Sequence, residues 1–266
     1  MKYFELEWRG GATATRLHKR RTGIEHLPWG TLATTDLDPA YRFEARAIWS
    51  NGVFTEYASA AAFSALTTAM LECGAPVDLI AMCGDIVVDE MFHVELSSRL
   101  TMELGGAMAL EFDLANVAPA PSTQRPLMKA AELAVVTSCV SESLSVPAMA
   151  RSRVLASEPL CRAVLDRLLV DEGPHSRLGY WFLDWAAERL TDIERAALAA
   201  TAVTTIEAYA SLWQESCDGC PPPLGLGGHD AVGRQDLRAA VENMIARPLA
   251  RYGIELDKER VAQLVA

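Results

Sequence analysis

The sequence predicts an all-α protein: a four-helix bundle with additional C-terminal helices and an irregular N-terminal arm. Half of the 266 residues are hydrophobic, and Ala and Leu, which favour helix, are abundant. Apolar residues recur at helical spacing over long segments, and no convincing series of strand-like alternation appears. Turn signals at Gly74-Ala75-Pro76 and Ser157-Glu158-Pro159 divide the chain into pieces of helical length. A chain of this size can bury the core of a single domain, 1–266.

The elements follow in order from these signals. Residues 1–39 contain several glycines and mixed charge, and we expect an arm with a short strand or two within Tyr3–Trp8. Gly74 ends one helix and Pro76 restarts the chain, while Ser157 is a candidate N-cap with Pro159 near the first helical position. We expect helices at 40–73, 76–104, 124–156, 159–190, 192–216, 231–250 and 256–265, a long crossover at 105–123 and a Pro- and Gly-rich loop at Cys217–Gly228.

Two copies of the pattern Asp-Glu-x-x-His point to the function, at Asp89–His93 and Asp171–His175. Glu at i and His at i+3 lie on the same helical face, one turn apart. Glu56 and Glu90 stand at similar distances from the turn at Gly74, and Glu142 and Glu172 stand at equal distances from Ser157, so two docked hairpins would bring these groups to one level. Such sets bind two iron or manganese ions in carboxylate bundles. The predicted ligands are Glu56, Glu90, His93, Glu142, Glu172 and His175.

Burial supports a metal at these positions. Each Glu interrupts an apolar or small-residue helical face; the face around Glu172, for example, carries Leu165, Leu168 and Leu169. A buried carboxylate must be paired, protonated or metal-bound. Four carboxylates and two His cannot neutralise one another, whereas two divalent cations bring the formal charge of the cluster to zero. Lys and Arg are missing from these faces, which disfavours a salt-bridge network.

Residues next to the ligands have two interpretations. Asp89 and Asp171 are either solvated acids or acceptors for the non-ligating N–H of each His, which would fix its tautomer. Glu95, Glu103 and Glu132 fall off the inner faces, and we expect them to be solvated. Small residues near the ligands form either a pocket above the metals or close helix packing: Gly52, Ser59, Ala60, Cys83, Cys139 and Ser145. Nearby aromatic residues form either an electron relay or part of the core: Tyr57, Tyr180, Trp181 and Trp185.

Composition narrows the class of protein. The net charge of −11, from 24 basic and 35 acidic residues, disfavours a nucleic-acid partner, and the basic segment Arg16–Arg21 alone is typical of a solvated segment. The sequence contains no stretch of about 20 apolar residues without charge, so we expect no membrane span. The start of the chain lacks the apolar run of a signal peptide, and six scattered Cys suit reduced, buried thiols, so we expect a cytoplasmic protein. Cys217-x-x-Cys220 looks like half a zinc site or a redox pair, but it has neither a partner pair nor a βαβ setting.

The ligand pattern resembles the ferritin-like superfamily of dinuclear iron carboxylate proteins, in its oxygenase and oxidase branch. The runs Val136–Ser143 and Val170–Tyr180 look like a group of bacterial ferritin-like domain proteins of largely unassigned function. Many relatives carry Arg before the motif His, where this chain has Phe92 and Pro174. N-oxygenases of the p-aminobenzoate type carry another His where this chain has Leu168, so N-oxygenation is not specifically supported. Pro174 inside a helix predicts a kink or bulge at the metal.

The resemblance implies a ferritin-like bundle with a metal-binding core at 40–190, the arm at 1–39 and additional helices at 191–266. We expect a non-haem di-iron oxidase or monooxygenase that uses O2 on a small organic substrate, with two Fe ions and an external electron donor. A Mn/Fe pair and a homodimer stay open. The rival from another class is a ferroxidase or iron-handling protein without an organic substrate, and a third interpretation is a metal-bound structural or ligand-binding module. Residues outside the bundle favour the oxygenase, because storage subunits are usually little more than the bundle.

Overall fold

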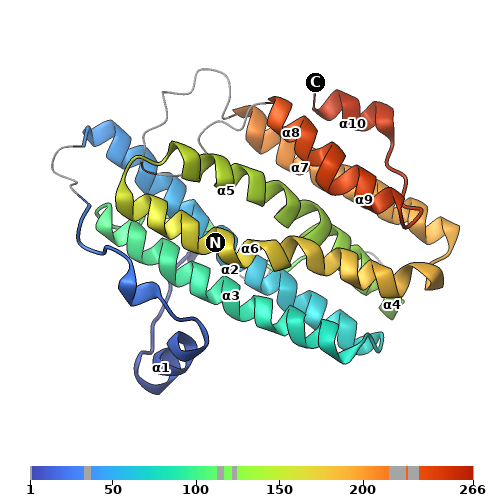
Figure 1. The fold of residues 1–266 in the computed structure, drawn as a ribbon, viewed down its shortest axis with the longest axis horizontal. Coiled ribbons are helices and arrows are strands. Elements are labelled where there is room, and N and C mark those ends of the chain that lie inside the picture. The colour runs from blue at the N-terminus through green and yellow to red at the C-terminus, as the bar shows by residue number, and fades with distance from the viewer. Residues whose placement is uncertain are drawn as a thin grey trace.

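The computed structural model describes residues 2–32, 37–112, 117–121, 125–215, 226 and 234–265. Over these residues the protein is mostly helical, as the sequence predicts, and its one sheet there is a pair of two-residue strands. Cys217 and Cys220 lie outside the described residues. Four long helical segments lie side by side (Figure 1): α2 (Pro39–Glu72), α3 (Val77–Glu103), the continuous helix of α4 (Pro126–Ala134), η4 (Val135–Glu142) and α5 (Ser143–Leu155), and α6 (Pro159–Ala186).

Local chemistry sets the ends of the first hairpin. The Asp38 carboxylate accepts a hydrogen bond from the backbone N–H of Ala40 at 2.8 Å, and Pro39 occupies the first turn of α2. Past the end of α2, Gly74 has φ of 66°, a left-handed conformation that favours glycine. Pro76 then precedes α3, which runs back along α2. The predicted hairpin is therefore present, with ends within a residue or two of those expected.

The second hairpin differs from the prediction in its details. Glu158, not Ser157, stands at the N-cap of α6, without a side-chain cap, and Pro159 follows in the first turn. Helix α6 runs unbroken through Pro174 to Ala186. The next three residues form the 3₁₀ turn η5 (Ala187–Arg189). The wide turn occurs instead in the partner helix, where η4 is a π-helix that ends at Glu142. π-Turns within α-helices are frequent at functional sites.

The apolar interior lies in two parts, one on each side of the level of the predicted ligands. The part nearer the turn at Gly74 contains Phe63 and Phe182. The part towards the other end of the helices contains Phe92, Leu100 and Leu168. Between them, the helices present acidic and imidazole side chains rather than apolar ones. The polar level is therefore flanked by an apolar region on each side along the helix axes.

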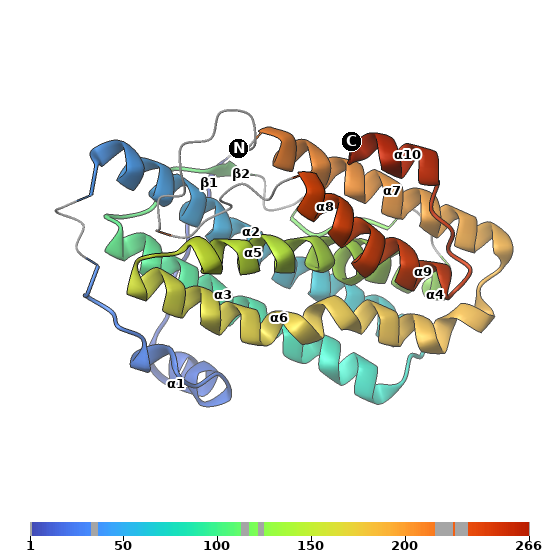
Figure 2. The same cartoon turned by 45° about the horizontal axis from the view of Figure 1, so that its top comes forward.

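Additional helices cover the α4–η4–α5 segment (Figure 2). The sequence predicts one helix at 231–250. Its described part, 234–250, is an α-helix, a π-helix and a second short α-helix in succession. The π-helix lies just before Pro248, which lacks a backbone N–H. The hydroxyl of Tyr180 in α6 donates to the carbonyl of Met244, which ties this layer to the four long segments. The covering elements are α7 (Asp192–Glu215), α8 (Arg234–Ala240), η6 (Val241–Ala246), α9 (Arg247–Ala250) and α10 (Lys258–Leu264).

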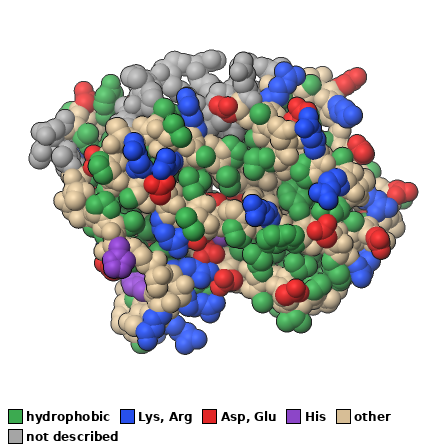
Figure 3. Space-filling model, viewed as in Figure 1, with side chains coloured by type: hydrophobic (Ala, Val, Ile, Leu, Met, Phe, Trp, Pro, Cys, Tyr) green, Lys and Arg blue, Asp and Glu red, His purple; other side chains and the backbone are tan. Residues whose placement is uncertain are grey.

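The N-terminal arm is more regular than predicted. It contains α1 (Gly11–Arg20) and the 3₁₀ turn η1 (Ile24–His26), and β1 (Lys2–Tyr3) pairs antiparallel with β2 (Glu111–Phe112) in the crossover. The basic segment Arg16–Arg21 is largely exposed, as expected: α1 contains no buried residue, and Arg20 pairs with Asp85 at 2.9 Å while both side chains stay about half exposed. Figure 3 shows Lys and Arg side chains gathered on the projecting lobe that α1 forms in Figure 1.

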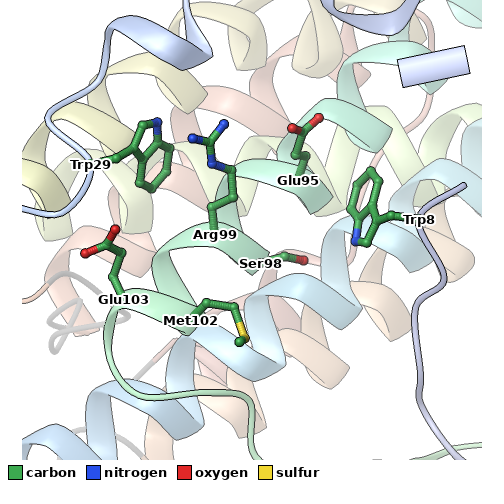
Figure 4. A pocket seen from close by; sticks show the side chains of 7 residues that line it. All are labelled: Trp8, Trp29, Glu95, Ser98, Arg99, Met102 and Glu103. Atoms are coloured by element: carbon green, nitrogen blue, oxygen red, sulfur yellow. The ribbon is translucent and has the colours of Figure 1, made fainter. Parts of the chain in front are cut away.

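The seam between the arm and α3 is a shallow hollow (Figure 4). Trp8 and Trp29 of the arm face the outer side of α3, where the Arg99 guanidinium lies 4.4 Å from the centre of the Trp29 ring. The expectation that three off-face glutamates are solvated is wrong: Glu95 pairs with His18 at 2.9 Å, and Glu103 accepts the backbone N–H of Gly30 at 2.8 Å. The third, Glu132, is buried in α4.

By length and composition alone, one helix among the described residues could cross a membrane, although the sequence holds no uncharged apolar stretch of about 20 residues. The helix Pro126–Leu155 reaches a mean hydropathy of 1.4 over its most apolar window, and 61% of that window is buried inside the protein. A buried core helix passes the same test of length and composition. Its central place, under the covering helices and against α6, accounts for the apolar composition.

Gly179 marks the closest approach of α6 to η4. A Cβ at this position would meet the Cys139 sulfur at 2.5 Å and the Ala134 carbonyl oxygen at 2.8 Å. We expect Gly179→Ala to lower the free energy of unfolding by about 1–3 kcal/mol, because backbone must shift to admit the methyl group. Gly84→Ala in α3 is the control, since a Cβ there meets nothing within 4 Å. Urea denaturation measures both variants, and equal stability would contradict the close approach.

Candidate metal centre

The structure brings all six predicted ligands together. Glu56 comes from α2, Glu90 and His93 from α3, Glu142 from the end of η4, and Glu172 and His175 from α6. Five of them are buried, and the Glu56 side chain keeps 14% of its surface exposed. In each of three overlapping groups the ligand atoms lie within 4.8 Å of one another; the groups are Glu90, His93 and His175; Glu56, His93 and Glu172; and Glu142, Glu172 and His175.

Glu90 and Glu172 occupy the centre of the cluster. One oxygen of Glu90 lies 2.9 Å from Nδ1 of His175, and the other lies 3.7 Å from Nδ1 of His93. The oxygens of Glu172 lie 3.3 Å from Nδ1 of His93 and 3.3 Å from Nδ1 of His175. Each of the two carboxylates therefore faces both imidazoles.

The remaining two carboxylates divide between the imidazoles. Glu56 lies 3.5 Å from Nδ1 of His93, whereas Glu142 belongs to the group that contains His175. The cluster thus has two halves, Glu56 with His93 and Glu142 with His175, joined by Glu90 and Glu172. This arrangement offers each of two cations one imidazole, one carboxylate of its own and a share of two central carboxylates.

Unpartnered buried atoms test whether a metal fits here. Both carboxylate oxygens of Glu90, one of Glu172, and Nδ1 of His93 and of His175 are buried, and the close contacts among them lack hydrogen-bond geometry, so none of these atoms has a hydrogen-bond partner. Buried polar groups in native proteins are normally hydrogen-bonded, and each exception requires an explanation. Carboxylate oxygen and imidazole nitrogen are ligands of iron and manganese. The donor set and its missing partners fit a pair of divalent cations.

The electrostatics of the cluster agree with this. Burial raises the pKa of Glu56 to about 8 despite its contact with His93, and burial followed by repulsion from Glu172 and Glu90 raises the pKa of Glu142. Burial also acts to raise the pKa of Glu90, but contacts with His175 and His93 outweigh it and lower the pKa.

Glu172 behaves like Glu90. Burial acts to raise the pKa of Glu172, but its contacts with the two imidazoles bring that pKa well below the ordinary range. Burial acts to lower the pKa of both imidazoles, but the facing carboxylates raise the pKa of His175 to about 12 and that of His93 well above its usual value. Two imidazolium ions and two carboxylates then cancel, with Glu56 and Glu142 protonated. Two divalent cations would replace these four protons without changing the charge of the cluster.

The two aspartates lie behind the imidazoles in a crossed arrangement. Nε2 of His93 in α3 lies 3.2 Å from Asp171 in α6, and Nε2 of His175 in α6 lies 3.4 Å from Asp89 in α3. Each His thus turns Nδ1 towards the carboxylates and Nε2 towards an aspartate of the facing helix. This is the placement that the orienting role requires, and the role itself stays a prediction.

Each aspartate is in turn held by an arginine that the sequence did not single out. Arg167, one turn before Asp171 on α6, pairs with it and lies 4.9 Å over the Phe92 ring. Arg21, directly after α1, pairs with Asp89 and reaches Asp85 at 3.1 Å. The spacing of Arg167 and Asp171 could have revealed the first pair. No local signal connects Arg21 to Asp89, because the contact joins the arm to α3.

Ser138 in η4 supports the position of His175. Its hydroxyl donates to the backbone carbonyl of His175 at 2.6 Å and accepts the backbone N–H of Gly179 at 2.7 Å. These two backbone groups stand four residues apart, the pair that bonds directly in a regular α-helix. The Ser138 hydroxyl therefore links two backbone groups of α6 in the turn that follows His175. The sequence placed Ser138 on the inner face but did not predict this contact.

A cavity of about 360 Å³ lies beside the cluster, with Glu56, Glu142 and Glu172 in its wall. Of the small residues considered from the sequence, Gly52, Ser59 and Ser145 line this cavity. The other three, Ala60, Cys83 and Cys139, are buried in helix packing. Both interpretations therefore hold, each for part of the set.

The aromatic residues considered as a relay make packing contacts. Tyr57 packs on Phe4 with ring centres 5.3 Å apart, the Tyr180 hydroxyl lies 3.2 Å from the Cys139 carbonyl oxygen, and Trp185 packs on Phe182 at 5.6 Å. Trp181 is 37% exposed. The tyrosine that lines the cavity is Tyr209 of α7, which sequence reasoning missed because α7 lies outside the motif-bearing helices.

If the aspartates orient the ligand imidazoles, removal of their charge should weaken the site without unfolding it. We expect Asp89→Asn and Asp171→Asn each to lower metal affinity by about 10–100-fold, because the Nε2–H loses a charged acceptor. Competition with a coloured chelator measures the affinity, and far-ultraviolet circular dichroism checks the fold. Asp166→Asn, at an exposed site paired with Arg153, is the control. Unchanged affinity in both variants would reject the orienting role.

Comparison of the chain with protein-family models, with curated proteins and with solved structures found no match.

Proposed function

We propose that this protein is an O2-activating, non-haem di-iron oxidase or oxygenase that acts on a small organic substrate. The observation that carries the proposal is the buried cluster of four glutamates and two histidines with a cavity beside it. The four long helices that supply the cluster correspond in this proposal to a ferritin-like four-helix bundle, which presents one Glu from each of two helices and Glu-x-x-His from each of the others.

The donor set favours iron over zinc. Structural zinc sites in proteins are tetrahedral and rich in Cys and His, whereas carboxylate-rich sites suit iron and manganese. Glu56 and His93 would hold one ion, Glu142 and His175 the other, and Glu90 and Glu172 would be shared. A pair of reduced irons supplies the electrons and open coordination positions that activation of O2 needs. A Mn/Fe pair fits the same ligands.

The protein's own groups prepare this site. Asp89 and Asp171 direct Nδ1 of each imidazole inward, and Ser138 fixes the turn of α6 that follows His175. Apolar regions of the core flank the cluster on both sides. The cavity provides room for an organic molecule in contact with Glu142 and Glu172. A reductant outside the chain would supply electrons for repeated turnover.

The cavity also separates this proposal from its main rival. A ferroxidase needs a path for iron ions, but it does not need a largely apolar space beside the metals. The cavity wall contains five large apolar side chains: Trp49, Leu144, Met149, Leu165 and Leu168. Such a lining would attract an organic substrate rather than a hydrated cation.

The test is rapid mixing of the anaerobic Fe(II) protein with O2. We expect a transient near-ultraviolet or visible absorption whose decay accelerates when a suitable organic compound is present, with formation of an oxidised product. A ferroxidase would instead turn over many irons per chain with no organic product. Glu142→Ala is the matched control, since it keeps the helices but removes one ligand. Continuous deposition of ferric iron, with no change in any organic compound offered, would decide for the rival.

A further inference from the structure

The cavity beside the cluster has a direction. On α2 most of its lining residues precede Glu56, and on α5 they follow Glu142 as far as Ser152. On α3 the lining residue follows His93, and on α6 the lining residues precede Glu172. Because α2 and α3 are antiparallel, as are α5 and α6, these positions all lie on the same side of the cluster. The cavity therefore extends from the metal ligands along the helix axes, away from the turn at Gly74.

The length of the cavity follows from the register of α5. Ser152 lies ten residues beyond Glu142, which corresponds to about 15 Å along a helix. Between these two ends the wall is mainly apolar, with Leu144, Ala148 and Met149 from α5. A molecule that touches both ends must be elongated.

The charge of the wall excludes whole classes of ligand. Its lining contains no Lys, Arg or His among the described residues, and its only ionisable groups are the cluster glutamates and Tyr209. A carboxylate or phosphate would therefore be buried without a counterion, which is costly. Once two divalent cations neutralise the cluster, no excess negative charge remains to bind an amine. The wall fits a neutral molecule.

Ser152 provides one polar contact at the far end. It is 2% exposed, and its hydroxyl has no hydrogen-bond partner. The hydroxyl of Ser145, earlier on the same helix, bonds back to the carbonyl of Ser141 at 2.8 Å. An unpaired buried hydroxyl is an exception in native proteins, and a bound molecule with a hydrogen-bonding group would satisfy it.

We propose that the substrate is a neutral, elongated aliphatic compound with one hydroxyl or carbonyl group. Its polar group binds the Ser152 hydroxyl, and its chain lies along α5 with the other end at Glu142 and Glu172. This inference rests on the proposed function for its oxidative role. The binding step itself depends only on the cavity and can be measured without turnover.

The experiment is calorimetric titration of the metal-loaded protein under anaerobic conditions with octanol, octanoate and octylamine. We expect octanol to bind and both charged analogues to bind at least about tenfold more weakly. Ser152→Ala should weaken octanol binding by about 2- to 10-fold through loss of one hydrogen bond. Ser64→Ala in α2 should leave octanol binding unchanged, because Ser64 does not line the cavity and its hydroxyl already bonds to the carbonyl of Ala60 at 2.7 Å.

A second pair of variants tests the location independently of Ser152. A Cβ at Gly52 or at Gly84 meets no atom within 4 Å, and of the two only Gly52 lines the cavity. We expect Gly52→Phe to abolish octanol binding while metal stoichiometry is retained, and Gly84→Phe to change neither. If metal loads but octanoate binds as well as octanol, or Gly52→Phe binds octanol normally, the substrate class is overturned and the proposed function stands. If no iron loads, the proposed function fails, and the substrate assignment fails with it.

Discussion

Glu90→Ala is expected to abolish metal binding at both positions of the cluster. Glu142→Ala is expected to lower the metal content from about two ions per chain to about one. The difference follows from geometry. The two oxygens of Glu90 face different imidazoles, so its removal takes a donor from each half of the cluster. Glu142 belongs to the half that contains His175 alone. Elemental analysis after anaerobic Fe(II) loading and desalting measures the stoichiometry.

The control for this series is Glu95→Ala, which removes another largely buried glutamate of α3 that pairs with His18 outside the cluster. It should keep the wild-type stoichiometry. Glu56→Ala should resemble Glu142→Ala, because Glu56 serves the half that contains His93. If elemental analysis of the wild-type protein after this loading found one zinc ion and no iron, the proposal of a dinuclear iron site would be rejected. Equal occupancy in the Glu90 and Glu142 variants would reject the bridging role of Glu90.

Removal of the metal is expected to lower the thermal stability of the protein substantially. A ligand that binds only the folded state at a thousand times its dissociation constant stabilises it by about 4 kcal/mol. In a chain of this length that corresponds to a melting temperature lower by roughly 10 °C once the metal is removed. The physical reason is that bound cations would be the partners of the buried, unpaired oxygens and nitrogens of Glu90, Glu172, His93 and His175. Differential scanning calorimetry with and without a chelator measures the shift.

The same measurement on Glu90→Ala provides the control, because a protein that cannot bind metal should melt at one temperature with or without chelator. A chelator effect of equal size in that variant would assign the stabilisation to ions bound elsewhere. A wild-type protein insensitive to both chelator and added iron would show that the cluster is satisfied by protons alone.

The sequence by itself determined the helical class and the six residues that form the buried Glu/His cluster. Helical periodicity and the Gly74 and Pro159 signals located both hairpins because these are local effects of backbone conformation. The doubled motif predicted which buried acidic and imidazole groups would cluster, because a carboxylate on an apolar helical face is costly without a partner. Equal distances from the turns then implied that the groups meet at one level, and the structure brings them to one level.

Only the tertiary structure decided how these groups are paired. The sequence contains nothing that assigns Asp171 to His93 and Asp89 to His175, since each contact crosses between α3 and α6. Likewise, Arg21 reaches Asp89 from an arm that the sequence predicted to be irregular. The π-helix at Val135–Glu142 was also unpredicted, because its widened turn depends on packing against α6 rather than on local propensity. Short-range rules fix which residues share a face, but the approach of one helix to another is set by the packing of the whole core.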